Sequence, residues 1–313
     1  MRELYIGEKG YLELLSDVLT GGVDVKNKRT GTVCRTVFDA RFIVPEGEHF
    51  LVTHRPAPLR LAFEEFWFFL RGGLDTKQLE EKGCNFWVGN TSRDFLDKRG
   101  LYYLPEGHLG LAYSAQWRNA GGNYETYYND HLIKSPDFSK LDWEGVDQLY
   151  DLCLGLWNDP YSRRHIVTLW NPFQSDSMCL TPCWHTSQYM VLPNKEGKNT
   201  LHVKLINRSL DVPFGMLYAI QQYRLFQMVL CKMYGFELGK LVADITNAHV
   251  YDNQIDYANE ITTRDLGNTG RIDILKSIDS FDDLLTLQWS DIKVSGLEVN
   301  KTEFKTKRPP MVA

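Results

Sequence analysis

The chain has 313 residues, of which 43% are hydrophobic and 24% are charged, a composition typical of a globular protein with a sizeable core. The formal net charge is −5, so the surface as a whole predicts binding neither to DNA nor to a membrane, and any anion site must be built locally from arginines. No apolar run approaches the roughly 20 residues that a membrane-spanning helix needs, and no secretory signal is recognisable. We therefore expect a cytoplasmic protein whose six cysteines are reduced.

The N-terminal half is predicted to contain two helices separated by strands. A first helix is expected over residues 9–19, ended by Gly21 and Gly22. Alternating β-branched and aromatic residues predict strands within residues 32–52. A second helix, very rich in aromatic side chains, is expected over residues 58–70.

The C-terminal half is predicted to be dominated by strands around one long helix. Apolar spacing of three and four residues predicts a helix over residues 143–157. Strands are expected at residues 165–170, 187–192 and 200–207, and a long apolar helix over residues 218–234.

Strands and helices alternate without a strict βαβ order, which predicts an α+β fold with a mixed sheet. No repeat or linker-like stretch appears, so residues 1–313 are expected to form a single domain. Neither a Walker loop nor a strand-GxGxxG-helix unit occurs, and the His and carboxylate residues lack HExxH-type spacing. No metal site is therefore predicted.

One cysteine, Cys183, follows a proline in the stretch LTPCWHTSQYMV, which otherwise alternates like a strand. A lone cysteine in such a pattern is more often a buried core residue than a nucleophile. Adjacent arginines would reverse that expectation because positive charge favours the thiolate. The candidates stand in unusual local contexts: Arg29 in VKNKRTGT, Arg163 and Arg164 in YSRRHIVTLWNP, and Arg208 in LINRSLDVPFG.

Arg208 and Ser209 follow an apolar strand and precede a Pro-Phe-Gly turn. A guanidinium group and a hydroxyl at this point could together hold a phosphate. Several arginines and one thiol in an acidic protein are compatible with a small phosphorylated substrate that is attacked by sulfur.

Two further segments carry groups suited to proton transfer or sugar binding. Glu64 and Glu65 lie in the aromatic segment AFEEFWFFL, where a carboxylate either faces water or is buried with a raised pKa suited to proton transfer. Facing water is the favoured alternative for Glu64, and it is less favoured for Glu65. His249 and Tyr251 are two residues apart in NAHVYDNQ and would share one face of a strand. Such a pair can bind a sugar hydroxyl, although a lone histidine is more often structural.

As a set, these segments resemble the thymidylate synthase family over nearly the whole chain. The motifs that carry the resemblance are KRTGT (28–32), FEEFWFFLRG (63–72), FWVGNTSRDFLD (86–97), GLAYSAQWR (110–118), SRRHIVTLWNP (162–172), LTPC (180–183), RSLDVPFG (208–215) and NAHVYDN (247–253). Each motif is weak alone, and their order and spacing make the set specific.

The resemblance implies a single α+β domain with a twisted mixed sheet packed by helices, one sheet face forming a dimer interface. It also implies one-carbon transfer from 5,10-methylenetetrahydrofolate to C5 of a pyrimidine nucleoside 5′-monophosphate. Cys183 would add to C6 and so activate C5 as a nucleophile. Tyr113 would assist removal of the C5 proton, Glu65 would organise water and proton transfers, and Arg208 would bind phosphate and favour the thiolate.

The remaining assignments also come from the resemblance. The residues assigned to the nucleotide are Arg29, Arg163, Arg164, Arg208, Ser209, Asp211, Ala219, His249 and Tyr251. Arg163 and Arg164 match arginines that the family donates across the dimer, which implies a homodimer with composite sites. The residues assigned to the folate are Trp87, Asn90, Asp211, Gly215 and, at the end of the tail PPMVA, Ala313.

Two positions depart from the family pattern. Ala219 stands where the family has an asparagine that pairs with the uracil edge, and cytosine-specific relatives have aspartate. A methyl group makes neither hydrogen bond, so Tyr218, Gln221 or Gln222 is expected to replace it, or a water. Trp184 stands where histidine is usual and predicts a changed water network.

Three functions stay open at this point. The first is reductive methylation of dUMP or dCMP, favoured by Trp87, the QWR at 116–118 and the tail. The second is hydroxymethylation, in which water captures the C5 methylene and no dihydrofolate forms. The third is a non-catalytic relative that binds a nucleotide or RNA, which retention of Cys183 and the arginines disfavours. The divergent base site also raises the hypothesis of a phage-encoded enzyme acting in the host cytoplasm.

Overall fold

The computed structural model describes residues 4–28, 30–122 and 145–310. Its centre is an eight-stranded sheet in which the order β1-β3-β8-β6-β5-β4 is extended by β2 beside β3 and by β7 beside β8. The strands are β1 (Tyr5–Ile6), β2 (Val23–Lys26), β3 (Val33–Val44), β4 (Ile166–Thr168), β5 (Trp184–Pro193), β6 (Asn199–Asn207), β7 (Leu210–Asp211) and β8 (Glu237–Tyr251).

The sheet is mixed. β3 pairs antiparallel with β8, and β4, β5 and β6 form an antiparallel series. The pairs β6–β8, β7–β8 and β1–β3 are parallel. The predicted α+β class with a mixed sheet is confirmed.

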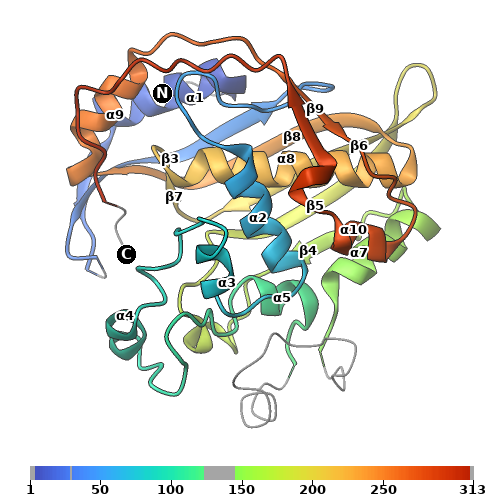
Figure 1. Cartoon of the computed structure of the whole chain (residues 1–313), viewed down its shortest axis with the longest axis horizontal. Helices are drawn as coiled ribbons and strands as arrows, with labels where there is room; N and C mark the ends of the chain where they lie inside the picture. The colour runs from blue at the N-terminus through green and yellow to red at the C-terminus, as the bar shows by residue number, and fades with distance from the viewer. Residues whose placement is uncertain (1–3, 29, 123–144, 311–313) are drawn as a thin grey trace.

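Helices cover one face of the sheet in two layers (Figure 1). α1 packs on β3, α8 packs on β6 and β8, and α2 packs on α8. The α-helices are α1 (Gly7–Gly21), α2 (Leu59–Leu70), α3 (Lys77–Glu80), α4 (Arg93–Lys98), α5 (Ser114–Arg118), α7 (Gln148–Asn158), α8 (Gly215–Tyr234), α9 (Ile255–Thr262) and α10 (Phe281–Thr286). Short 3₁₀ turns are η2 (Ser175–Ser177), η3 (Asp252–Gln254) and η4 (Trp289–Asp291), and β9 (Arg271–Ile274) pairs with β10 (Ile292–Ser295).

α8 is buried along most of its length, which explains its long apolar sequence. Of its 20 residues, 15 are buried, including the charged Arg224. The Arg224 guanidinium donates to the backbone carbonyls of Pro45, Glu48 and Gly239 at 2.6–2.8 Å. The helix ends at Gly235, which takes the left-handed conformation that closes many helices.

Most predicted elements are confirmed, with shifts at their ends. The strand region predicted for residues 32–52 is wrong at its C-terminal end, because β3 stops at Val44. Pro45 has no N–H for a sheet ladder and Gly47 takes a positive φ of 70°, so the chain turns there. The helix predicted from residue 143 begins at Gln148, after the Asp147 side chain caps it.

The opposite face of the sheet exposes apolar side chains. Phe38 is 74% exposed, Ile166 50% and Met190 42%. Among the described residues, no helix is long and apolar enough to cross a membrane.

Candidate active site

Two adjoining cavities form one cleft beside the N-terminal turns of α8. The apolar half lies between Trp87, Tyr113, Trp184, Phe214 and Tyr218 and has a cavity volume of about 190 Å³. The polar half has a cavity volume of about 390 Å³. Its polar wall is formed by Arg208, Asn247, His249 and Tyr251. Residues that border both halves are Asn90, Leu180, Cys183, Ser209, Asp211 and Gly215.

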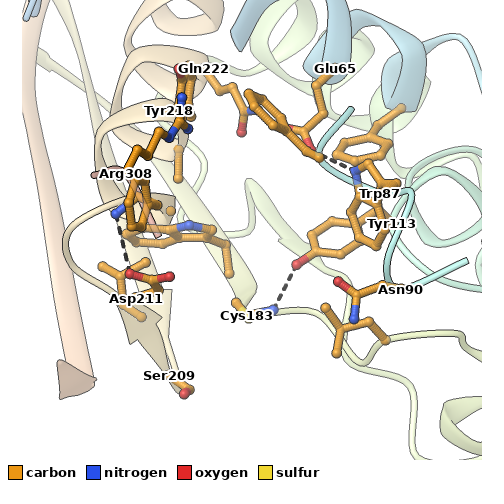
Figure 2. A pocket seen from close by; sticks show the side chains of 18 residues that line it. Glu65, Trp87, Asn90, Tyr113, Cys183, Ser209, Asp211, Tyr218, Gln222 and Arg308 are labelled. Atoms are coloured by element: carbon orange, nitrogen blue, oxygen red, sulfur yellow. Dashed lines mark hydrogen bonds between the residues drawn. The ribbon is translucent and has the colours of Figure 1, made fainter. Parts of the chain in front are cut away.

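Cys183 lies where the two halves meet, directly before β5 (Figure 2). All six cysteines are in the described part of the chain, and Cys183 alone among them is not buried. Burial raises the pKa of Cys84, Cys153, Cys179 and Cys231 to about 12, so these four stay protonated thiols at neutral pH. Access and position therefore single out Cys183 as the candidate nucleophile.

The Arg208 guanidinium is fixed beside this thiol. Its Nε donates to Pro182 O at 3.0 Å, and its Nη2 donates to Thr181 O at 2.8 Å. The same Nη2 lies 4.0 Å from Cys183 Sγ. These bonds hold the Arg208 guanidinium against the loop that carries Cys183. The positive charge therefore lies close to the sulfur, where it stabilises a thiolate.

Tyr113 reaches the same residue from the N-terminus of α5. Its hydroxyl oxygen accepts from Cys183 N at 2.9 Å, and its ring stacks on Phe69 with centroids 5.0 Å apart. Burial raises the pKa of Tyr113 well above its ordinary value, so the phenol keeps its proton. A protonated hydroxyl at this point can orient a water or a substrate group.

Glu65 is a buried carboxyl at the other end of the apolar half (Figure 2). Its Oε1 accepts from Trp87 Nε1 at 2.6 Å, and its Oε2 accepts from Gln222 Nε2. Burial raises the pKa of Glu65 to about 7, which agrees with the buried one of the two alternatives that the sequence left open. The prediction for Glu64 is wrong: it is also buried, and it pairs with the half-exposed Lys82 at 2.7 Å rather than facing water.

The polar half contains several of the side chains that were predicted to hold a nucleotide. Arg208 and Ser209 border it together with His249 and Tyr251 of β8, whose ring centroids are 5.0 Å apart. His249 Nδ1 is 2.9 Å from Asn247 Oδ1. The predicted placement of His249 and Tyr251 on one strand face is confirmed.

Asp211 joins the two halves and is held by two hydrogen bonds. Its Oδ2 accepts from Gln254 Nε2 at 3.0 Å, and its Oδ1 accepts from Phe214 N at 3.3 Å. Burial raises the pKa of Asp211 to about 6. Among the predicted folate residues, Asn90 and Gly215 border both halves, and Trp87 borders the apolar half.

Not every predicted site residue reaches the cleft. Arg163 and Arg164 precede β4, and both are exposed. Neither borders the cleft of this chain. Arg29 and Ala313 lie outside the described residues. Within the described residues, no three His, Cys, Asp or Glu side chains lie together in a way that could hold a metal ion.

Both positions that depart from the family pattern face the apolar half. Ala219 is 5% exposed and presents only a methyl group to it, and Trp184 is 6% exposed. The Trp184 ring lies 6.4 Å from that of Tyr223. The sequence thus located the divergent part of the pocket.

Arg308 was missed by the sequence reasoning. It borders the apolar half, and its Cζ lies 5.2 Å from the centroid of the Phe214 ring. Its one signal was its place directly before PPMVA, the tail that was already assigned to the folate.

Comparison with known proteins decides the family. The thymidylate synthase family profile matches residues 9–307. The chain belongs to the thymidylate synthase family. It is 32% identical over 283 residues to thymidylate synthase of Saccharomyces cerevisiae, covering 88% of this chain and 90% of the relative. It is 34% identical over 253 residues to the enzyme of Agaricus bisporus, covering 80% and 82%.

A longer relative matches over part of its length. The chain is 34% identical over 251 residues to the bifunctional dihydrofolate reductase-thymidylate synthase of Leishmania major. That match covers 80% of this chain and 46% of the relative, so the chain spans about half of the bifunctional protein.

Replacing Glu65 with glutamine should change how stability depends on pH. Burial raises the pKa of Glu65 from 4.5 to about 7, so between these values the folded chain keeps a proton that the unfolded chain has released. The free energy of unfolding of the wild type should therefore fall relative to that of E65Q as the pH rises through this window, by at most about 3 kcal/mol. Denaturant titrations between about pH 5 and pH 8 measure the difference, and parallel curves would contradict the prediction.

Proposed function

We propose that this protein transfers a one-carbon unit from 5,10-methylenetetrahydrofolate to C5 of a pyrimidine nucleoside 5′-monophosphate, dUMP or dCMP, and forms the 5-methyl nucleotide. The observation that carries the proposal is the position of Cys183 Sγ, which lies where the two halves of the cleft meet and 4.0 Å from Arg208 Nη2. A nucleophile at that junction can contact a nucleotide on one side while a second substrate approaches from the other.

The polar half suits the phosphate and the sugar. Arg208 and Ser209 offer a guanidinium group and a hydroxyl to the phosphate, to which Arg29 adds a second guanidinium group by family resemblance. His249 and Tyr251 offer polar groups to the sugar hydroxyl. A nucleotide placed this way directs its base past Cys183 toward Glu65.

The reaction follows from the chemistry of the base. The Cys183 thiolate forms a bond to C6, and the C5–C6 electron pair moves toward C5 and the C4 substituent, which makes C5 nucleophilic. C5 then bonds to the one-carbon unit. The Tyr113 hydroxyl, which keeps its proton, positions the water that removes the C5 proton. As that proton leaves, the bond between the one-carbon unit and the folate nitrogen breaks, so that C5 carries an exocyclic methylene. A hydride from the folate, which leaves as dihydrofolate, would complete the methyl group, and departure of the sulfur from C6 restores the C5–C6 double bond.

The apolar half suits the folate. Trp87, Phe214 and Tyr218 provide flat aromatic surfaces for a ring system, and Asp211 provides a polar anchor at its border. The folate supplies the one-carbon unit and, for a methyl product, the hydride. With a pKa of about 7, Glu65 can exchange protons at neutral pH.

A second candidate product is the 5-hydroxymethyl nucleotide. It is favoured by Trp184 and Ala219, which alter the wall beside Cys183 and so the water that can reach the C5 methylene. The two reactions share Cys183, the arginines and the folate. They differ in whether hydride or water adds to the methylene group on C5.

The product assay separates these reactions. The protein is incubated with methylenetetrahydrofolate and each of dUMP, dCMP, UMP and CMP, and product mass and dihydrofolate absorbance are recorded. We expect a 5-methyl product with an equal amount of dihydrofolate from one deoxynucleotide. A hydroxymethyl product without dihydrofolate would replace the first reaction by the second, and absence of turnover with all four nucleotides would refute both.

Replacing Cys183 with serine should abolish product formation, because an alcohol at neutral pH is a far weaker nucleophile toward C6 than a thiolate. Cys34 is the matched control, since it is a second thiol bordering the polar half and is buried. C34S should keep activity within about threefold of the wild type. Full activity in C183S would disprove the mechanism.

We further propose a homodimer in which Arg163 and Arg164 enter the site of the partner subunit. Both arginines are exposed and do not border the cleft of their own chain, so their side chains are available to a partner subunit. Exposed Phe38, Ile166 and Met190 on the uncovered sheet face are apolar surface of the kind that subunit interfaces bury.

Subunit mixing tests the composite site. C183S and the double variant R163A/R164A should each lack activity as homodimers. When the two are mixed and allowed to exchange subunits, half of the dimers are mixed and each has one intact site, so activity should return to about a quarter of the wild-type value. If mass spectrometry shows mixed dimers while activity stays absent, the arginines do not act across the interface.

A further inference from the structure

Gln222 lies on the wall of the cleft, one helical turn after Ala219. Both residues are on α8, and spacing of three residues places them on the same side of the helix. Both border the apolar half and are almost fully buried, at 5% exposed for Ala219 and 6% for Gln222. The methyl group of Ala219 cannot form a hydrogen bond with the base. Gln222, one turn further along the helix, has a side-chain amide that can.

The Gln222 amide is held in one orientation. Its Nε2 donates to Glu65 Oε2, and the other oxygen of Glu65 accepts from Trp87 Nε1. When Glu65 is ionised, its carboxylate only accepts hydrogen bonds, and in that form the amide turns its nitrogen toward Glu65 and its oxygen away, as the structure has it. No group in the described residues donates to Gln222 Oε1.

The neighbouring candidates are placed differently. Gln221 is 1% exposed and does not border the cleft, and its two amide atoms have no partner among the described residues. Tyr218 borders the apolar half, but its ring packs on Phe86 with centroids 4.6 Å apart, beside the part of the cleft that Arg308 also borders. Gln222 is the candidate whose amide is aligned by the proposed catalytic carboxyl.

In the proposed placement of the nucleotide, the N3–C4 edge of the base faces the end of the cavity where Glu65 and Gln222 lie. With C6 at Cys183 and the phosphate at Arg208 and Ser209, the N3–C4 edge points away from the phosphate. Figure 2 shows Ser209 and the Glu65–Gln222 pair at opposite ends of the cavity, with Cys183 between them. A buried N–H of the base without an acceptor at that end would destabilise the complex.

We infer that Gln222 recognises the pyrimidine base: its Oε1 accepts the N–H at the N3–C4 edge, in place of the polar side chain that position 219 lacks. Uracil presents this donor at N3 and cytosine presents it at the exocyclic amine. Gln222 is thus a substrate-binding residue that requires an N–H at this edge of the base, and its orientation is fixed by Glu65, which Trp87 in turn holds. The inference rests on the proposed function, because it uses the nucleotide placement given there.

The test measures binding without folate, so that turnover plays no part. Calorimetry gives the affinities of the wild type and of Gln222→Met and Gln222→Leu for dUMP, dCMP and deoxyribose 5-phosphate. A fourth probe is the deoxynucleotide of pyrimidin-2-one, whose N3–C4 edge carries no N–H. Gln221→Met is the matched control: it is the same change at the adjacent glutamine, outside the cleft.

We expect the Gln222 variants to bind the preferred base about 10- to 100-fold more weakly than the wild type does. They should bind deoxyribose 5-phosphate with unchanged affinity, which also shows that they are folded. The wild type should bind the pyrimidin-2-one nucleotide more weakly than the preferred base by a similar factor, while the Gln222 variants bind both alike. Q221M should match the wild type with every probe.

Three results would overturn the inference. The Gln222 variants could bind dUMP and dCMP as the wild type does, or lose affinity equally for the abasic probe, which would indicate a structural role. Either result leaves the proposed function standing if the wild type binds nucleotides and turns them over. A wild type that binds no nucleotide at all would refute the proposed function and the inference with it.

Discussion

The position of α8, and with it the shape of the cleft, depends on one buried cation. Arg224 donates to the carbonyls of Pro45, Glu48 and Gly239, which ties the helix both to the turn after β3 and to the start of β8. Burial lowers the pKa of Arg224 to about 10, so it remains charged at neutral pH. Removal of its partners would leave an uncompensated charge in the core. Because Gln222 is half a turn away on the same helix, the wall of the cleft is held by those bonds.

Side chains of the same type differ in their proposed roles because they differ in burial and in access to the cleft. Cys183 and Cys179 are four residues apart, yet Cys179 is sealed in the core with a pKa of about 12 and Cys183 meets the cleft beside Arg208. Glu65 and Glu64 are adjacent, and only Glu65 borders the cleft. A carboxyl and a thiol therefore acquire their proposed roles from the surfaces that surround them, rather than from their own residue type.

The sequence predicted the elements that have a strong local pattern. The aromatic helix near residues 58–70 and the long helix ending at Gly235 were found because their hydrophobic spacing is unmistakable. The family resemblance then named most of the residues that border the cleft. What it could not supply were contacts between distant segments: Gln222 and Glu65 are 157 residues apart, and neither carries a local signal that the other is its partner. Glu64 was misplaced for the same reason, because burial is decided by what packs on a helix from elsewhere.

The pairing of β3 with β8 has a consequence for how the chain is made. Thr36 bonds to Ala248, 212 residues later, so an early strand has no neighbour on that side until most of the polypeptide has been synthesised. At about 5–20 residues per second, the ribosome takes roughly 10 to 40 s to cover that distance. During this interval the edge of β3 that pairs with β8 has no partner strand, and His249 and Tyr251 have not yet been synthesised to complete the polar half of the cleft. The polar half of the cleft, which we propose binds the nucleotide, is therefore completed late in translation, after a period in which this edge of the nascent sheet is open to aggregation.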